Sequence, residues 1–279
     1  MAFVLTTDPA EFSDQATPFL ETNLECNVLA TVLISVLSGR YRDVQPVFGY
    51  QLDGLGAVTA VAMRTPPAAM LISSLAPDAI HVLLEAWLRL DPTLPGVNGP
   101  PETARGVAAA WSRLTGGRVH MARAMAMHSL QQVSDPPRPP EGRLRPGMRD
   151  ERDRLIAWWR AFADEAGGDG AAGAEANVDA RLPHQSILLW DDGGPVSLVA
   201  VQPAVAGVVR IGPVYTPPEH RRHGYAGAAV AEVSRRALAA GAHTCMLFTD
   251  LDNPTSNKIY FELGYRRFAD WEEYRFSAA

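Results

Sequence analysis

The sequence is poor in cysteine and has no apolar run long enough to cross a membrane. Its 279 residues include two cysteines, Cys26 and Cys245, far apart in the chain, which excludes a disulfide framework and a CxxC zinc pattern. The longest apolar run, residues 28–37, is shorter than the roughly 20 residues that a membrane-spanning helix needs. The start of the chain lacks the basic and apolar regions of a signal peptide. We therefore expect a soluble cytoplasmic protein.

Basic charge is also scarce. The formal net charge of −6 and a pI near 5.6 argue against a nucleic acid or an anionic membrane as the partner. The seven histidines are scattered without ligand spacing, so no metal is predicted. The sequence is 47% hydrophobic and 20% charged, which is typical of a chain with a packed core. Its length suits one large domain or two of ordinary size.

Proline and glycine gather in one segment. Residues 134–147 hold five prolines and two glycines. Proline ends helices and removes a donor from a strand, so this composition predicts a semi-rigid linker. The prediction divides the chain into an N-terminal domain of residues 1–133, the linker 134–147 and a C-terminal domain of residues 148–279.

Hydrophobic periodicity predicts the elements of each domain. In the first domain we expect a helix over 20–37, strands over 47–53, 57–65 and 69–75, a helix over 78–90 capped by Asp78, a short strand near 96, a helix over 102–117 and a strand over 118–130. In the second we expect a helix over 149–166, a mobile Gly/Ala-rich loop over 167–184, strands over 185–194, 195–204 and 208–216, a helix over 224–241, a strand over 243–250, a helix over 253–264 and a final strand or strand pair. This order indicates an α/β or α+β fold with a mixed sheet.

The run "VYTPPEHRRHGYAGAA" carries the most chemistry. A β-branched strand ends at Pro217 and Pro218, and a helix begins near Gly224. The first amides of that helix have no partner within the helix and lie at its positive end. Gly224 allows a ligand to approach the backbone, small Ala226 keeps that approach open, and neighbouring arginines add charge. The turn is therefore predicted to hold a phosphate or pyrophosphate, the alternative being an ordinary turn with solvated arginines.

Two motifs resemble those of the GCN5-related N-acetyltransferases (GNATs). Arg221-x-x-Gly224-x-Ala226 resembles their Q/R-x-x-G-x-G/A signature for acyl-CoA. "NPTSNKIYFELGY", beginning at Asn253, resembles their N-x-x-S-x-x-x-Y…GF/GY block. The resemblance covers about residues 143–276 and implies a mostly antiparallel mixed sheet of the acyl-CoA N-acyltransferase type. We interpret the first half as a second, degenerate GNAT-like domain, the alternative being an unrelated α/β cap.

The resemblance also implies roles for individual residues. Those expected to contact the cofactor are Val214, Tyr215, Thr216, Arg221, Arg222, His223, Gly224, Tyr225, Ala226, Gly227, Asn253 and Ser256. The main chain at 214–216 is expected to pair with the pantetheine arm, the amides of 222–227 to hold the pyrophosphate, and Asn253 and Ser256 to lie beside the pantetheine or to brace the parted strands. Tyr260 is expected to act as general acid toward the thiolate.

The predicted function is transfer of an acetyl group from acetyl-CoA to a primary amine by direct attack in a ternary complex. Another acyl-CoA donor and a non-catalytic CoA sensor remain alternatives, the acceptor is open, and so is a homodimer. Weaker candidates for the general base or for the acceptor pocket are Glu219, Asp250, His184, Asp169, Glu175, Asp179, Trp158 and Trp159. The acidic residues among 167–184 favour a cationic amine.

Overall fold

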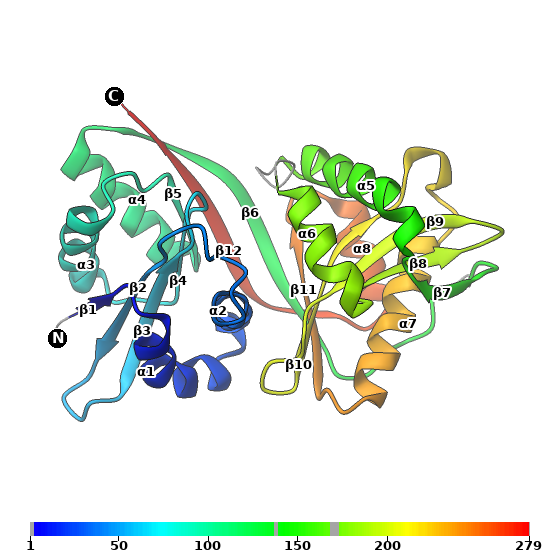
Figure 1. The fold of residues 1–279 in the computed structure, drawn as a ribbon, viewed down its shortest axis with the longest axis horizontal. Coiled ribbons are helices and arrows are strands. Elements are labelled where there is room, and N and C mark those ends of the chain that lie inside the picture. Colours follow the sequence, from blue (N-terminus) through cyan, green and yellow to red (C-terminus); the bar gives the residue numbers. More distant parts are fainter. Residues whose placement is uncertain (1–2, 137–138, 168–172, 279) are drawn as a thin grey trace. The chain divides into compact units, whose positions relative to one another are not determined.

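The structure is a computed structural model that describes residues 3–136, 139–167 and 173–278 (Figure 1). The chain forms a mixed α/β protein with a mostly antiparallel sheet. Its contacts divide it into unit 1, Met1–Met125 with Ala269–Ala279, and unit 2, Ala126–Phe268. The Pro-rich segment 134–147 therefore lies inside unit 2, and the last strand of the chain ends in unit 1.

Unit 1 contains a sheet with strand order β1-β2-β3-β4-β5-β12. Its strands are β1 (Phe3–Thr6), β2 (Val47–Leu52), β3 (Val58–Arg64), β4 (Met70–Ile72), β5 (Gly96–Gly99) and β12 (Arg266–Ser277). Neighbouring strands run antiparallel except β4 and β5, which run parallel. The helices are α1 (Pro9–Thr22), α2 (Asn27–Leu37), α3 (Pro77–Leu90) and α4 (Pro101–Thr115), with a 3₁₀ turn at Leu24–Cys26.

Local signals explain where the helices of unit 1 begin and end. The carboxylate of Asp8 accepts from the amides of Ala10 and Glu11, so α1 starts earlier than the predicted helix 20–37. Helix α4 ends at Gly116, whose φ of 73° suits glycine. The predicted N-cap of α3 was wrong, because Ala76 occupies that position and Asp78 lies inside the first turn.

Unit 2 contains a sheet with strand order β6-β11-β10-β9-β8-β7. Its strands are β7 (Arg143–Pro146), β8 (Ile187–Asp191), β9 (Pro195–Val201), β10 (Val208–Tyr215), β11 (Thr244–Asp250) and the end of β6 (Arg118–Leu130), whose residues up to Met125 belong to unit 1. Strands β7 to β10 pair antiparallel in sequence, whereas β10 and β11 run parallel. The helices are α5 (Arg152–Glu165), α6 (Ala174–Arg181), α7 (Tyr225–Ala239) and α8 (Pro254–Glu262), with 3₁₀ turns at Arg149–Glu151, Leu182–His184 and Pro218–His220.

The sheet of unit 2 is covered on both faces. Successive residues of a strand point to opposite faces, and β9 shows this clearly. Leu198 packs with Trp159 and Val178 of α5 and α6, whereas Val199 packs with Val230 of α7 in the other cluster. Figure 1 shows α5 and α7 on different sides of these strands. The ends of β10 and β11 therefore lie between two helical layers.

One predicted loop proved partly helical. Residues 167–184 were expected to be a mobile loop, but α6 and a 3₁₀ turn occupy Ala174–His184, held by Ala174 and Val178 in the core. Residues 168–172, and with them Asp169, lie outside the described residues. Within the part of the chain that the structure describes, no helix is long and apolar enough to span a bilayer.

Candidate active site

The parallel strands β10 and β11 stop pairing before either strand ends. They pair at three positions, Val208–Thr244, Val209–Cys245 and Arg210–Met246. Both strands then continue, β10 to Tyr215 and β11 to Asp250. Backbone groups on that side of β10 beyond Arg210 therefore have no strand neighbour in the pairing that the described residues make. An extended ligand segment with amide groups can take the place of the missing strand.

The other side of β10 is fixed by β9. The register shifts between Ile211 and Val214, which pair with Val201 and Val199. Such a bulge bends a strand and re-aims its residues. Beyond it, the hydroxyl of Ser197 donates to the carbonyl of Tyr215 at 3.1 Å and lies 2.8 Å from the hydroxyl of Thr216. The predicted residues Val214 to Thr216 are thus held from β9 at the point where β10 and β11 have separated.

The loop from β10 to α7, residues 216–224, ends in an open helix terminus. Arg222 and Gly224 have positive φ values of 69° and 86°, and the amide of Ala228 donates to the Gly224 carbonyl at 3.0 Å. For the described residues, no hydrogen bond occupies the backbone amides of 222–227. The predicted cradle therefore consists of successive unpaired amides at the positive end of a 15-residue helix.

Arg221 is not a free cation in this loop. Its Nε donates to the carbonyl of Thr216 at 2.9 Å, and its guanidinium donates to both carboxylate oxygens of Glu165 at 2.6 and 2.8 Å. The guanidinium also lies 5.8 Å from the ring centre of Tyr215. The Glu165 hydrogen bond, which is the main cause, raises the pKa of Arg221. Of the two arginines expected to supply charge, this one is already paired.

The first residue of α7 is anchored as well. The Tyr225 hydroxyl donates to the carboxylate of Asp192 at 2.6 Å, and this hydrogen bond raises the pKa of the phenol. The ring of His223 stacks on Tyr225 at 5.6 Å between centres. Ala226 is half-buried and Gly227 is buried, with Ile259 of α8 3.5 Å from where a Cβ of Gly227 would lie. The helix terminus is thus fixed in place while its amides stay unoccupied.

Asn253 and Ser256 cap α8. The Asn253 side chain accepts from the amide of Ser256 at 3.1 Å, and the Ser256 hydroxyl donates to the carbonyl of Asn253 at 3.2 Å. The carbonyl of Asp250 at the end of β11 accepts from the backbone amide of Asn253 and from the side-chain amide of Asn257, both at 3.1 Å. Sequence reasoning did not single out Asn257, although it lies within the quoted motif.

Tyr260 lies on α8 inside the core of unit 2. It is 8% exposed, and burial raises the pKa of its phenol well above the usual range. Its ring meets that of Tyr265 edge-on at 5.9 Å. Among the described residues no hydrogen bond contributes to this shift, which burial alone causes. The phenol therefore stays protonated at neutral pH.

Comparison with known proteins shows which fold produces this geometry. Residues 193–276 match the model of the FR47-like protein family. A GCN5-related N-acetyltransferase from Sphaerobacter thermophilus is 18% identical, with a TM-score of 0.60 over 98% of this chain and 95% of that one. The chain has the GNAT fold. A GNAT from Kribbella flavida is 16% identical, with a TM-score of 0.60 over 92% of this chain and 97% of that one.

The GNAT fold occupies both units. A tandem GNAT protein from the clavulanic acid biosynthesis pathway is 13% identical, with a TM-score of 0.56 over 98% of this chain and 97% of that one. No curated protein matches the sequence. The expected fold, an acyl-CoA N-acyltransferase sheet in tandem, is therefore confirmed. That the first half is degenerate stays a prediction.

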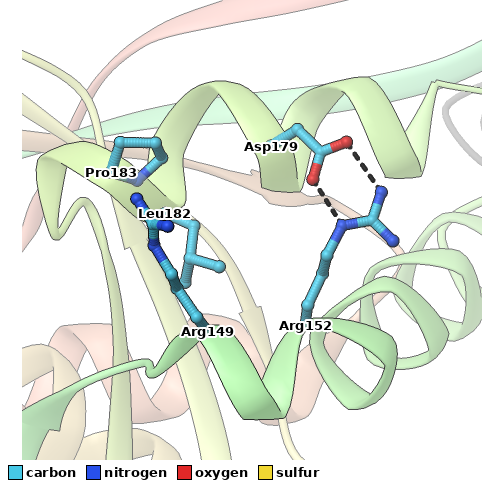
Figure 2. Close-up of a pocket in the computed structure, with 5 residues that line it drawn as sticks. All are labelled: Arg149, Arg152, Asp179, Leu182 and Pro183. Atoms are coloured by element: carbon cyan, nitrogen blue, oxygen red, sulfur yellow. Dashed lines mark hydrogen bonds and ion pairs between the residues drawn. The ribbon is translucent and has the colours of Figure 1, made fainter.

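On the α5 and α6 side of this GNAT fold, the acidic candidates are already paired. Arg152 donates to both oxygens of Asp179 at 2.6 and 2.7 Å (Figure 2). It also donates to Glu175 at 2.8 Å. The Arg152 hydrogen bonds lower the pKa of Asp179. The hollow in Figure 2, about 230 Å³, is lined by Arg149, Arg152, Asp179, Leu182 and Pro183. No predicted cofactor residue lines it, so it is separate from the candidate site.

The remaining candidates divide between the strand ends and the core. Trp159 is buried beneath Arg181, whereas half-buried Trp158 packs 6.4 Å from the ring of Tyr215. Trp158 is therefore the one of the pair that reaches the end of β10. The carboxylate of Asp250 accepts from the amide of Asp252 at 2.8 Å, so it caps a turn. His184 is exposed at the end of a 3₁₀ turn.

Proposed function

We propose that unit 2 is an acetyl-CoA-dependent N-acetyltransferase that moves the acetyl group to a primary amine by direct attack in a ternary complex. One observation carries the proposal. Strands β10 and β11 stop pairing after Arg210 and Met246 although both continue, and the loop that follows β10 ends in unpaired amides at the start of α7. This arrangement offers an extended amide-bearing arm a strand edge and offers its phosphates a helix terminus.

The residues present suit coenzyme A. Pantetheine carries amide groups that can pair with the main chain of β10 at residues 214–216, where β11 has turned away. A pyrophosphate needs hydrogen-bond donors and positive potential, which the amides of 222–227 and the α7 dipole supply. Arg222 and His223 are exposed next to these amides. The proposal requires only two partners, acetyl-CoA and an amine.

The chemistry follows from three groups in this proposal. The neutral amine attacks the thioester carbonyl, and a main-chain amide at the end of β10 stabilises the oxyanion. The attacking nitrogen loses a proton to solvent water and the carbon–sulfur bond breaks. Tyr260 protonates the leaving thiolate and regains a proton from solvent. Cys245 is fully buried, and burial raises the pKa of its thiol to about 11. A thiolate nucleophile is therefore not available at neutral pH, which supports direct attack over an acyl-cysteine intermediate.

Titration calorimetry with acetyl-CoA tests the binding step. Gly224→Glu places a carboxylate and a side chain where the phosphates are proposed to lie, and we expect micromolar binding by the wild type to fall by at least a hundredfold. Gly241→Glu is the matched control. Gly241 has a φ of +101° just beyond the far end of α7 and open space around its Cβ position, so this variant adds the same charge and comparable backbone strain elsewhere.

The outcomes separate clearly. Loss of binding in Gly224→Glu with retention in Gly241→Glu supports the cradle and justifies an amine screen. No binding by the folded wild type would remove the central claim. Equal loss in both variants would trace the effect to general backbone strain. Turnover of an amine with acetyl-CoA, and its absence with CoA alone, then distinguishes an enzyme from a CoA sensor.

A further inference from the structure

We propose that Glu165, the last residue of α5, is a positioning residue for the proposed cofactor loop. Through Arg221 it holds residues 216–224 in the conformation that leaves the amides of 222–227 open. This inference rests on the proposed function for its ligand, because the loop is taken to bind the pyrophosphate of coenzyme A. The conformational part concerns the chain alone and is tested without ligand.

A chain of hydrogen bonds joins α5 to the start of the loop 216–224 and to Arg221 within it. Glu165 accepts two hydrogen bonds from the guanidinium of Arg221, at 2.6 and 2.8 Å. The Nε of Arg221 binds the carbonyl of Thr216 at 2.9 Å. Thr216 is in turn fixed to Ser197 of β9 at 2.8 Å. Both hydrogen bonds to Glu165 come from Nη2 of Arg221 and the bond to Thr216 comes from Nε, so the guanidinium is held at two of its nitrogens.

The residue after Arg221 is the one that needs such support. Arg222 has a φ of 69°, a left-handed conformation that is disfavoured for any residue with a Cβ. Strained backbone persists where its surroundings hold it. Tyr225 and Asp192 fix the far side of the turn, so Glu165 and Arg221 supply the near side. Without them the loop can relax and turn its amides away from a common ligand.

The position of Glu165 itself indicates a specific partner. A carboxylate in the last turn of a helix lies at the negative end of the helix dipole and is disfavoured there, and α5 has no basic residue in its last turn. Asp164 shares that disadvantage, is exposed, and among the described residues has no side-chain partner. Glu165 differs in that its carboxylate accepts from Arg221. Asp164→Asn is therefore a control with the same charge change at the next position.

Helix α5 reaches the same strand end through a second contact. Trp158 lies seven residues before Glu165, about two helical turns, on the same face. Its ring packs 6.4 Å from Tyr215, over which Arg221 also lies. Helix α5 thus contacts both the end of β10 and the loop that follows it, so a change in α5 is transmitted to the loop through side chains in direct contact.

The test compares Glu165→Gln with Asp164→Asn in two measurements on the whole chain. Without ligand, hydrogen exchange is measured at the loop amides of His220 and Arg221, which donate to the carbonyls of Pro217 and Pro218. With ligand, dissociation constants are measured for acetyl-CoA and for acetyl-pantetheine, which lacks the pyrophosphate. For Glu165→Gln we expect exchange about fivefold faster and acetyl-CoA binding about fivefold weaker, as suits a solvent-exposed ion pair. Acetyl-pantetheine binding and both Asp164→Asn results should match the wild type.

Each result has one meaning. Unchanged loop exchange in Glu165→Gln overturns the proposal whether or not the wild type binds acetyl-CoA. Tighter acetyl-CoA binding in Glu165→Gln also overturns it, because Glu165 would then compete with the pyrophosphate for Arg221. Equal weakening of both ligands overturns it too, since the effect would not involve the phosphates. Faster loop exchange with no wild-type binding of acetyl-CoA sustains the anchor while removing the proposed function.

Discussion

The two units share one order of elements but differ in how far their parallel strands stay paired. Unit 1 runs β4-α3-β5-α4 into the long strand β6, and unit 2 runs β10-α7-β11-α8 into the long strand β12. In both, a strand leads through a helix to a parallel neighbour. In unit 2 the parallel strands separate and leave backbone groups unpaired. In unit 1 the corresponding strands stay together, so the same topology gives one open site and one closed core.

In unit 1, Gly99 and Thr103 occupy the position where unit 2 leaves backbone groups unpaired. A Cβ on Gly99 would lie 2.9 Å from the carbonyl oxygen of Ile72, so β5 lies directly against the end of β4. The amide of Leu75, in the turn after β4, donates to the hydroxyl of Thr103 on α4 at 3.0 Å. Helix α3 then begins at Ala76 and Pro77 without an arginine or a glycine. When these few backbone groups are contacted by other residues of the protein, no place is left for a ligand.

The largest expected effect concerns Tyr260 of α8, because the corresponding helix of unit 1, α4, contains no tyrosine. Tyr260→Phe removes the proposed acid and should lower kcat by about 10²- to 10⁴-fold, with acetyl-CoA affinity unchanged. Burial raises the pKa of Tyr260, so the wild-type phenol is protonated across the assay range. Steady-state kinetics with calorimetry would show this split.

Tyr265→Phe is the matched control for this variant. Tyr265 is fully buried beside Tyr260 and pairs with the Ser234 hydroxyl at 2.8 Å. Its loss should cost about 1 kcal/mol of stability with little change in kcat. A kcat within threefold of wild type in Tyr260→Phe would contradict the acid assignment.

The second effect should fall on unit 1 alone. Arg64 and Asp91 form a buried ion pair, with side chains 4% and 8% exposed, and Trp87 also donates to Asp91 at 3.3 Å. Asp91→Ala leaves Arg64 buried without its counter-charge, which typically costs about 3–5 kcal/mol. We expect this loss in urea unfolding with acetyl-CoA affinity unchanged. Asp78→Ala, on the exposed first turn of α3, should cost under about 1 kcal/mol. Loss of acetyl-CoA binding by folded Asp91→Ala would show that unit 1 contributes to the site.

Sequence patterns predicted most elements of both units because apolar periodicity reports burial directly. The strand over 118–130 matches β6, and the helix after Gly224 matches α7. The predictions were poorer where local composition misleads. Helix α6 lies in a Gly/Ala-rich stretch and is held by two buried residues, Ala174 and Val178. Strand β1 and helix α1 lie in a lead segment that looks polar.

The site was predictable in its motifs but not in its supports. The arginine and glycine of the β10–α7 loop stand close together in the sequence, so their pattern is visible. The pairing of Glu165 with Arg221 joins residues 56 positions apart, and nothing in either local sequence announces it. Asn257 is bound to Asp250 only because α8 folds back on the end of β11. Side-chain contacts of this kind depend on tertiary packing rather than on spacing.

The third prediction tests whether unit 1 lacks an acetyl-CoA site of its own because β5 and α4 cover the end of β4. Thr103→Val keeps the shape of the side chain but leaves the buried Leu75 amide without an acceptor, which costs about 1–3 kcal/mol. We expect calorimetry to give one acetyl-CoA per chain in the wild type and in this variant, because Gly99 still packs on Ile72. Thr115→Val, which removes an exposed hydroxyl that donates to the Trp111 carbonyl and accepts from the Gly117 amide at the other end of α4, serves as the control. Two sites per wild-type chain would break the comparison between the units.

The smallest effect compares the ion pairs of the two units as pH falls. In unit 2, Arg145 donates to Glu151 at 2.7 and 2.8 Å and to Asp191 at 2.6 Å, nearer the surface than the buried pair of unit 1. The hydrogen bonds from Arg145 lower the pKa of Glu151. A carboxyl with a lowered folded pKa stabilises the fold above its unfolded pKa, about 4.3, and loses that contribution as pH falls through the folded value.

Glu151→Gln should therefore be less stable than wild type by about 1 kcal/mol at pH 7, the range for a partly exposed pair. The difference should persist at pH 5.5 and shrink below pH 4, where the wild-type carboxyl takes up its proton. Urea unfolding at these three pH values measures it, with Glu232→Gln, a within-helix pair on α7, as the control. A difference that stays constant down to pH 3 would mean that Glu151 acts by packing rather than by charge, since protonation would then leave its contribution unchanged.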